Sequence, residues 1–471
     1  MIYNSDYDLW DWCTQNLQSK PLVLGKELKM KLTIGNVYVR DVVLGAEDKF
    51  EDGILTINKD AAIAYLMEED DHITELDIVI AHPGDDTRIV PVIETIEARV
   101  RMDDRCLFPG VTGDVQPCGE GDLKAFKGCC ITVVGKEWGS FGDGVIDMGG
   151  EGAKHTYWSK LINICLVGDN DEEFERHEQQ KMNHALRWAG HRFAEWVGRI
   201  AKDLEPEGTE VYEFDPLLKR DEARKDLPNV AIVLQPQSQM EALGYNDLLY
   251  GWDMNRYLPS FLSPTEVFDG CIISGSFMPA SSKWSTWAFP NCPTIKELFK
   301  YDGIEYNFEG VIMSNLNVAL DQKERSCVIA CNIAQNLGVD YAIITEEGYG
   351  NPDTDYVRMQ VIFEDAGIPV VGISNESDGR DGFGQPLVTL DEKMNANIST
   401  GNVGQLTELP ACATVIGNLE ALNRDGMSGS WGYDEILGKS ARDDGSILME
   451  DNNWFCGDHI SGLCLKTMLE Y

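Results

Sequence analysis

The chain has 471 residues, of which 43% are hydrophobic and 9% aromatic, so it should fold into two or three globular domains and is not a disordered protein. Its 39 basic and 79 acidic residues give a formal net charge of −40. A surface this acidic repels nucleic acid phosphates and anionic membranes, so we expect neither as a partner; it serves solubility or, alternatively, the docking of a basic partner.

The thirteen cysteines are odd in number and scattered, which does not suggest a disulfide framework. The first residues, MIYNSDYDLWDW, are acidic and lack the basic-then-apolar pattern of a signal segment. No apolar run approaches the roughly 18 residues needed to span a bilayer. We therefore expect a cytoplasmic protein with reduced thiols.

Residues 1–29 come before any regular pattern and are expected to form an N-terminal extension. Over residues 30–127, short apolar runs alternate with turns of Pro, Gly and Asp, which predicts a β-rich region. The strands expected there include Gly53–Ile57, Asp77–Ala81 and Ile93–Val100.

Residues 128–225 are expected to form an α/β region with one long amphipathic helix, Asp171–Leu204. The apolar side chains that share one face of this helix are Met182, Leu186, Ala189, Phe193, Val197 and Ile200. His177, His184 and His191 recur every seventh residue. A step of about 100° per residue places them opposite the apolar face, so we expect them to face water or a partner and not to bind a metal.

Residues 226–417 alternate between strand and helix patterns. The expected strands are Val230–Leu234, Val311–Met313, Tyr341–Thr345 and Pro369–Ile373, and the expected helices are Asp321–Leu337 and Thr354–Ala366. Asp321, with Glu324 three residues later, suggests a capping box. The alternation predicts a parallel, doubly wound sheet, so the fold class is α/β with a β-rich N-terminal region. Residues 418–471 form a Gly- and Asp-rich C-terminal tail that the pattern does not place.

In open α/β sheets, ligands bind beyond the carboxyl ends of the strands. The residues expected at that edge are Ser274, Ser314, Asn315, Glu346, Glu347, Asn375 and Arg380. Glu346 and Glu347 are adjacent, so they point in opposite directions on extended backbone and at most one faces a ligand as general acid or base. Arg380 lies in the Gly-rich loop Gly379–Gly384 and is suited to binding a substrate carboxylate through two hydrogen bonds. The alternative is that it pairs with Asp381 and only orders the turn.

The cysteine and histidine spacings do not favour a metal site. Cys456-x-x-His459 with Cys464 resembles half a zinc site without a second pair, and Cys327 and Cys331 fit core packing on a helix. The sequence also contains no phosphate-binding loop, dinucleotide fingerprint or nucleophile elbow. We therefore expect no metal and none of these cofactors.

Several stretches together resemble one family. They are Met30–Gly45, Gly144–Ala153, Tyr306–Asn317, Glu347–Asp355, Gly379–Gly382 and Ser399–Pro410. They resemble the pyruvoyl-type (alpha/beta proprotein) subunit of component B of the glycine, sarcosine and betaine reductases, and more distantly the D-proline reductase proprotein. The similarity covers about residues 30–417 and leaves out residues 1–29 and the tail.

The resemblance implies a subunit of a cytoplasmic complex in anaerobic metabolism. In that family, a selenocysteine or cysteine of a partner subunit attacks the carbon that bears the leaving group. The carboxymethyl group then passes to a small, A-type selenoprotein carrier. The subunit resembled here typically cleaves itself before a Cys, which becomes a pyruvoyl group and forms a Schiff base with the substrate amine.

The chain departs from the family at the cleavage position. The family pattern of Ser-Gly-Asn-Cys followed by Ala-Cys-Asp-Lys is here Ser274-Gly275-Ser276-Phe277 followed by Ala280-Ser281-Ser282-Lys283. Phe277 stands in place of the cleaving Cys and has no nucleophile, so we expect no pyruvoyl group at this position. Ser276, one position early, is the alternative nucleophile, and Asn291-Cys292 is a weaker one further along.

We therefore expect an uncleaved oxidoreductase subunit that binds substrate for reductive cleavage of a carbon–heteroatom bond beside a carboxylate. Without an imine, the substrate would be a quaternary amine, a halide or a thio-substituted acid. The expected catalytic residues are Glu346 and Glu347, and the expected substrate-binding residues are Ser274, Gly275, Ser276, Phe277, Asn315 and Arg380. The alternatives are a pyruvoyl-dependent subunit that uses Ser276 and a non-catalytic scaffold subunit.

Overall fold

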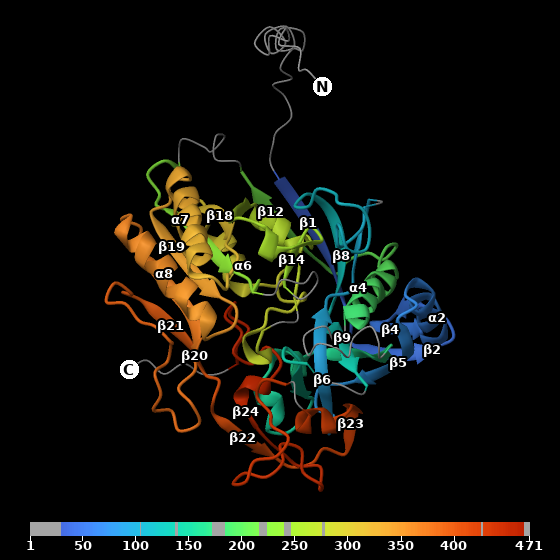
Figure 1. Ribbon diagram of the computed structural model, residues 1–471. Helices are drawn as coiled ribbons and strands as arrows, with labels where there is room; N and C mark the ends of the chain where they lie inside the picture. The colour runs from blue at the N-terminus through green and yellow to red at the C-terminus, as the bar shows by residue number, and fades with distance from the viewer. Residues whose placement is uncertain are drawn as a thin grey trace, which may run out of the picture.

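The computed structural model describes residues 30–103, 105–136, 140–171, 184–215, 224–239, 246–275, 278–424 and 427–465. The chain is of the α/β class, as expected, with several sheets and comparatively few helices. In Figure 1 the blue and teal N-terminal strands lie on one side and an orange layer of helices and strands on the other, with the red C-terminal part at one end.

The N-terminal part contains two larger sheets. The first has the order β12-β1-β8-β7, in which β1 (Met30–Tyr38) lies between β12 (Gly208–Phe214) and β8 (Gly121–Lys127), with β7 (Arg99–Arg101) at the edge.

The second sheet has the order β10-β6-β9-β11-β5, with β23 paired to β6. Its strands are β5 (Ile73–Ala81), β6 (Thr87–Ile96), β9 (Cys129–Gly135), β10 (Gly144–Asp147), β11 (Ile162–Asn170) and β23 (Thr414–Gly417). Strands from both sides of residue 127 therefore share one sheet. Every residue of β6 and β9 is buried, as expected for strands that are covered on both faces.

A third, small sheet has the order β2-β4-β3, from β2 (Asp41–Gly45), β3 (Lys49–Glu51) and β4 (Ile54–Asn58). Helix α2 (Lys59–Glu69) follows it and was not predicted. The Asn58 side chain caps this helix by accepting a hydrogen bond from the Ala61 N–H at 3.1 Å. Asn58, a residue type favoured at the N-cap, was therefore the sequence signal from which the start of α2 could have been predicted.

Helix α4 (His184–Arg199) is the described part of the predicted long helix, and Met182 and His177 lie outside the described residues. Leu186, Ala189, Phe193 and Val197 are buried, which confirms the apolar face. The solvent-facing prediction for His191 is wrong, because this side chain is fully buried. Its ring lies edge-on against the Phe108 ring, with 4.9 Å between the ring centres. Helix α4 is therefore covered on a second face, which the spacing of its apolar residues could not reveal.

The C-terminal sheet has the order β16-β18-β13-β19-β20-β21. Its strands are β13 (Asn229–Gln235), β16 (Ser260–Leu262), β18 (Asn307–Met313), β19 (Tyr341–Glu346), β20 (Val370–Glu376) and β21 (Asn397–Asn402). All neighbours pair in parallel except β16, which confirms the predicted parallel sheet. The chain leaves β13 toward β18 and leaves β19 toward β20, so the direction of winding reverses between β13 and β19.

Helices α7 (Leu320–Asn336) and α8 (Asn351–Asp365) pack together against one face of this sheet and bury a separate apolar core. The predicted capping box at Asp321 is wrong, because the N-cap is Ala319 and carries no side-chain cap. Asp321 instead pairs with Arg325, one helical turn later, at 3.2 Å on the exposed face.

The other face of the sheet packs against residues 246–301, which include α5 (Pro264–Phe268), β17 (Ile272–Ile273) and α6 (Pro293–Tyr301). The tail is also ordered: β22 (Leu406–Leu409) pairs with β24 (Ile447–Glu450), and η8 (Asp451–Asn453) leads into the buried Trp454. Within the described ranges, no helix combines the length and the apolar character needed to cross a membrane.

Candidate active site

Glu347 follows β19 at the point where the winding of the parallel sheet reverses. Its side chain is buried, and its two oxygens accept hydrogen bonds from the backbone N–H groups of Gln237, at 2.7 Å, and Trp284, at 2.8 Å. Such a reversal is where open α/β sheets bind ligands. The carboxyl group is therefore held in a fixed orientation at the position expected for a site.

A second buried carboxyl group, that of Asp247, interacts with Glu347. Asp247 Oδ1 accepts a hydrogen bond from the Gly275 N–H at 2.5 Å. Burial, followed by the nearby Glu347 charge, raises the pKa of Asp247 far above its usual range, and burial also raises the pKa of Glu347. Two carboxylates in one buried site cannot both ionise easily, so the pair retains a proton toward neutral pH.

Lys283 provides a buried cation beside these carboxyl groups. Its ammonium donates to the Ile93 carbonyl at 2.5 Å and lies 5.6 Å from the centre of the Phe455 ring. Its charge opposes the rise in pKa that burial imposes on Glu94 and Glu347. Lys283 therefore favours the ionised form of these carboxyl groups.

Three further ionisable groups complete this cluster, which consists of Glu94, Asp143, Arg187, Asp247, Lys283 and Glu347. Burial raises the pKa of Asp143 to about 6, against the charge of Lys283. Burial likewise raises the pKa of Glu94, and the charges of Lys283 and Arg187 oppose it. The cluster thus contains four carboxyl groups and two cations within the protein interior.

Residues of the cluster hold Ser274 and Gly275 in place, and this segment leads to the position at which the family is cleaved. The Ser274 N–H donates to Thr286 Oγ1 at 3.0 Å, and Arg187 donates to the Ser274 carbonyl. Thr286 is held in turn, since its own N–H donates to Glu94 Oε1 at 3.0 Å. Ser274 and Gly275 are therefore fixed next to the cluster, whereas Ser276 and Phe277 lie outside the described residues.

Glu346 points to the opposite face of the sheet, as expected for its extended backbone. It lies near Asp353 and Asp355 of α8, and burial, followed by those two charges, raises its pKa far above the usual range. Asn315 is also on this side, where its Oδ1 accepts a hydrogen bond from Ser326 of α7 at 3.2 Å. Neither side chain belongs to the cluster around Glu347.

Arg380 lies away from the cluster. Its guanidinium is partly exposed and pairs with Glu450 at 2.8 Å. It also stacks on Trp431, with 4.6 Å between the guanidinium carbon and the ring centre. These contacts are of the kind expected if Arg380 only orders the loop, although its partner is Glu450 and not Asp381. The role of Arg380 in binding a substrate carboxylate stays a prediction.

The C-terminal tail covers the site. The N–H groups of Cys456 and Asp458 donate to the carbonyls of Ala280 and Ser281 at 2.8 and 2.9 Å. Ser281 Oγ in addition donates to Asn452 at 3.0 Å. Burial raises the pKa of the Cys456 thiol far above its usual range, so this sulfur stays protonated. The tail that the sequence pattern left unplaced is thus one wall of the site.

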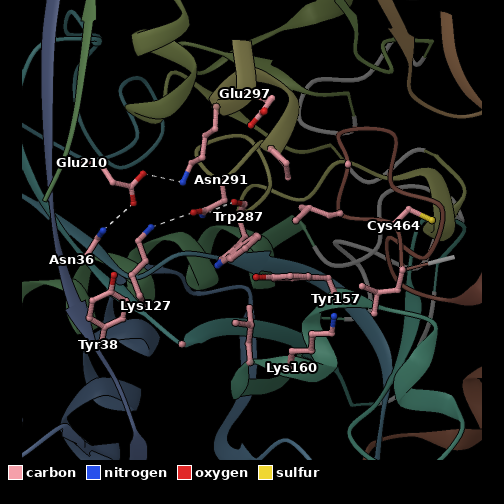
Figure 2. A pocket seen from close by; sticks show the side chains of 17 residues that line it. Asn36, Tyr38, Lys127, Tyr157, Lys160, Glu210, Trp287, Asn291, Glu297 and Cys464 are labelled. Carbon is pink, nitrogen blue, oxygen red and sulfur yellow. Dashed lines mark hydrogen bonds and ion pairs between the residues drawn. The ribbon is translucent and has the colours of Figure 1, made fainter. Parts of the chain in front are cut away.

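An open cleft of about 610 Å³ lies beside this region (Figure 2). Trp287 and Tyr157 pack together on its floor with ring centres 5.5 Å apart, and the Trp287 N–H donates to the Thr95 carbonyl at 2.8 Å. Trp287 therefore links the cleft to β6, the strand that carries Glu94.

Sequence reasoning found Glu347 but missed the other charged residues of the cluster. Glu94 offered a signal, because it is an acid within a ten-residue strand that is otherwise mostly apolar. Lys283 offered another, as the one charged residue of its run, which keeps the family's pattern there as Ala280 does. Asp143, Arg187 and Asp247 come from distant segments and gave no signal of their own.

No described group of three or more His, Cys, Asp or Glu side chains is arranged to hold a metal ion. At the position of the family's cleaving Cys the sequence has Phe277, so that position offers no thiol from which a pyruvoyl group could form. Cys292, the distant alternative, is buried at the start of α6, and burial raises the pKa of its thiol to about 12. This thiol is therefore poorly suited to attack a peptide bond.

Comparison with known proteins gives a match over residues 30–469 to the model of the glycine/sarcosine/betaine reductase component B subunits. The match extends beyond residue 417, so the expectation that the tail falls outside the similarity is wrong. The physical reason is the one described above: the tail walls the site. No solved structure gives a match.

Three relatives illustrate the similarity. The betaine reductase complex component B subunit alpha of Peptoclostridium acidaminophilum is 57% identical over 443 residues, which are 94% of this chain and 100% of the relative. The sarcosine reductase complex component B subunit alpha of the same organism is 38% identical over 392 residues, 83% and 90% of the two chains. The glycine reductase complex component B subunits alpha and beta of Acetoanaerobium sticklandii are 36% identical over 422 residues, 89% and 95% of the two chains. The chain therefore belongs to the family of glycine, sarcosine and betaine reductase component B subunits, which its sequence motifs had indicated.

Proposed function

We propose that this chain is the substrate-binding subunit of a complex that reductively cleaves the carbon–nitrogen bond of a quaternary amine beside a carboxylate, such as betaine. The observation that carries this proposal is the 57% identity, over the whole of the relative, to a betaine reductase component B subunit alpha. The chain would be an oxidoreductase subunit and would act only within the complex. A halide or thio-substituted acid remains a second substrate class, because neither needs an imine to leave.

The proposal includes that the chain works without a pyruvoyl group. Phe277 has no nucleophile, and a quaternary amine has no N–H with which to form an imine, so the missing group would not be needed. The names of the relatives are consistent with this view. The glycine reductase relatives are named as subunits alpha and beta, whereas the betaine and sarcosine relatives are named as a single subunit alpha.

In the proposed reaction, the thiolate or selenolate of a partner subunit attacks the methylene carbon of the substrate. The carbon–nitrogen bond breaks, its electron pair stays on nitrogen, and the tertiary amine leaves as a neutral molecule. No proton has to be delivered to this leaving group. We assign the Asp247–Glu347 pair to accept the proton of the partner's thiol or selenol, because the pair retains only part of its protons near neutral pH.

The proposed substrate contacts follow from the same site. Ser274 and Gly275 are held beside the cluster by hydrogen bonds to Thr286 and Asp247, and Ser276 and Phe277 keep their predicted role as substrate-binding residues. The predicted roles of Glu346, Asn315 and Arg380 are left to the tests below, because Glu346 and Asn315 lie on the face toward α7 and α8 and Arg380 lies in the loop after β20. The partners would be a selenocysteine or cysteine subunit of component B and a small A-type carrier. A cytoplasmic location suits the free thiols of the described cysteines.

Intact mass spectrometry of the purified chain tests the absence of a pyruvoyl group. We expect one polypeptide near 52.5 kDa. Two fragments with a break before Ser276 or Cys292, and a keto-acid cap on the second, would instead establish the pyruvoyl-dependent alternative.

Reconstitution with the partner subunits tests the substrate. We expect release of trimethylamine from betaine and no release of ammonia from glycine. Two results together would favour the scaffold alternative. The complex would cleave none of betaine, glycine and sarcosine, and its activity on any other carboxylic acid would be unchanged when this chain is left out.

A further inference from the structure

Asn375 and His459 are buried next to the candidate active site and carry polar atoms without partners. Asn375 is 1% exposed, and neither its Oδ1 nor its Nδ2 has a hydrogen-bond partner among the described residues. His459 is fully buried, and its Nε2 likewise has none within the described ranges. An unpaired polar atom in a protein interior costs stability, so such atoms indicate where a ligand or an ordered water binds.

Asn375 lies on the same face of the sheet as Glu347. The parallel register of β19 and β20, continued by two residues, places Asn375 beside Glu347. Ser374, the residue before it, faces α8, where its side chain hydrogen-bonds Tyr356. Because successive side chains of a strand alternate between the two faces, Asn375 points away from α8, as Glu347 does.

The next strand connects Asn375 to the C-terminal tail. A bulge in the pairing of β20 and β21 sets Thr400 and Gly401 opposite Asn375. Thr400 Oγ1 donates to the Asp458 carbonyl at 2.9 Å, and His459 is the next residue of the tail. Bulges often occur beside functional sites, where they redirect a strand. His459 is therefore brought to the part of the sheet edge that Asn375 occupies.

His459 leads back to Glu347 through Trp284. The His459 and Trp284 rings pack together with 5.0 Å between their centres, and the Trp284 N–H donates to Glu347 at 2.8 Å. These contacts close a circuit around one place in the interior, and we call it the contact ring. Its members are Glu347, Asn375, Thr400, His459 and Trp284.

The unpaired atom of His459 is a hydrogen-bond donor. Its Nδ1 accepts a hydrogen bond from the Ser461 N–H at 3.1 Å, so the ring proton of the neutral imidazole is on Nε2. Burial lowers the pKa of His459 to about 3, which keeps the ring neutral at physiological pH. The Asn375 Nδ2 is a donor as well. A carboxylate only accepts hydrogen bonds and suits both groups, whereas a cation suits neither.

We infer that Asn375 Nδ2 and His459 Nε2 bind the carboxylate of the substrate inside the contact ring. This inference rests on the proposed function and deepens it, because it assigns the substrate group that the reaction leaves unchanged. The carboxylate would lie beside the Asp247–Glu347 pair. Since that pair retains a proton, it does not oppose a further carboxylate with its full charge.

The main test is Asn375→Leu, which keeps the shape of the side chain and removes both polar atoms. In the reconstituted complex, we expect the KM for betaine to rise at least tenfold. We expect the melting temperature of the isolated chain to stay the same or rise, because an unpaired polar group is removed. A purely structural role would give the opposite pair of results, a lower melting temperature and an unchanged KM.

Two variants of His459 test the second donor. His459→Phe removes the Nε2 donor, whereas His459→Gln keeps an N–H group at a similar position. Both lose the acceptor for the Ser461 N–H, so both should lower the melting temperature alike. We expect KM to rise at least tenfold in His459→Phe and less than threefold in His459→Gln. Equal KM values in the two variants would exclude His459 from the carboxylate site.

Gln235→Leu is the matched control for Asn375→Leu. Gln235 is 2% exposed and has no described partner for either amide atom, but it pairs in register with Glu346, which faces α8. We expect its KM to stay within twofold. A tenfold rise in Gln235→Leu or Asn315→Ala, but not in Asn375→Leu, would place the carboxylate on the α8 face and overturn the inference. An unchanged KM in all of them would leave Asn375 with an ordered water only and also overturn it.

Calorimetric titration with betaine and with acetate separates this inference from the proposed function. We expect both acids to bind the unaltered complex at least tenfold more tightly than the Asn375→Leu complex. If such binding occurs in a complex that cleaves no betaine, the proposed function is overturned and the carboxylate site stands.

Discussion

Glu347 accepts a hydrogen bond from the backbone N–H of Trp284 at 2.8 Å, although the two residues are 63 positions apart in the chain. This bond joins the end of a parallel strand to the segment in which the family's cleavage position lies. It fixes the carboxyl group beside Asp247 and Lys283 in the protein interior. Four predictions follow from the cluster and from the loop that carries Arg380.

Replacement of Glu347 by Gln should lower the turnover of the reconstituted complex at least 100-fold, because the pair then has no second carboxyl group to accept a proton. The fold should persist, since Gln keeps the shape, although its amide group leaves one of the two backbone N–H donors unpaired at a cost of about 1–3 kcal/mol. The measurement is the rate of trimethylamine release from betaine.

Glu346→Gln is the matched comparison, because this adjacent side chain faces α8 instead of the cluster. We expect it to lower turnover less than fivefold. A larger loss of turnover in Glu346→Gln than in Glu347→Gln would place the catalytic role on the face of the sheet toward α8 and overturn this interpretation.

The melting temperature of the protein should fall as the pH rises from 5 to 8. Asp247 has a raised pKa in the folded protein, so the folded state holds a proton that the unfolded chain, with a carboxyl pKa near 3.8, has already released. A raised carboxyl pKa gives its full contribution to stability below the unfolded value and loses it as the pH increases. Each pH unit within this window costs up to about 1.4 kcal/mol per group.

Asp247→Asn should flatten this dependence. The Asn Oδ1 can still accept from the Gly275 N–H, and its amide can donate to Glu347, so the contacts persist without the proton. Asp71→Asn, at an exposed position, should leave the slope unchanged. Equal slopes in the unaltered chain and in Asp247→Asn would show that the pair does not hold the excess proton.

Lys283→Met should destabilise the fold by about 3–5 kcal/mol, because it leaves buried carboxylates without their nearest cation. The loss should be smaller at pH 5 than at pH 8, since protonation of Asp143, whose pKa is raised to about 6, relieves the unpaired charge. Chemical unfolding at both pH values measures this difference.

Lys300→Met is the control for Lys283→Met, because the Lys300 side chain is 60% exposed and its contacts, with Glu297 and the Tyr301 ring, lie at the surface. We expect a change below about 1 kcal/mol for this control. A loss in Lys283→Met that is independent of pH would point to packing alone and contradict the charge-balancing role.

Arg380→Ala separates the two roles that the sequence leaves open for this residue. A group that binds the substrate carboxylate would raise KM at least tenfold when removed, whereas removal of a group that only orders its loop would lower the melting temperature and leave KM unchanged. The pairing with Glu450 and the stacking on Trp431 lead us to expect the second result. A raised KM with an unchanged melting temperature would restore the carboxylate-binding role.

The sequence alone determined the α/β class and the parallel C-terminal sheet. Apolar runs such as Val230–Leu234 and Tyr341–Thr345 are short, continuous and separated by helices, so local pattern suffices to predict them. The sequence also determined the family, through short motifs such as Glu347–Asp355 that can be recognised directly. It determined the opposite directions of the Glu346 and Glu347 side chains as well, because these follow from the geometry of one strand.

Only the tertiary structure decided which residues form the site. Glu94, Arg187 and Asp247 are far apart in the chain, and periodicity reports a residue's face within one element but not what covers that face. His191 illustrates the same limit, since α4 is buried on the side that its pattern predicts to be exposed. The tail gave no pattern because its hydrogen bonds from Cys456 and Asp458 reach Ala280 and Ser281, which are distant in the chain, and local periodicity does not report such contacts.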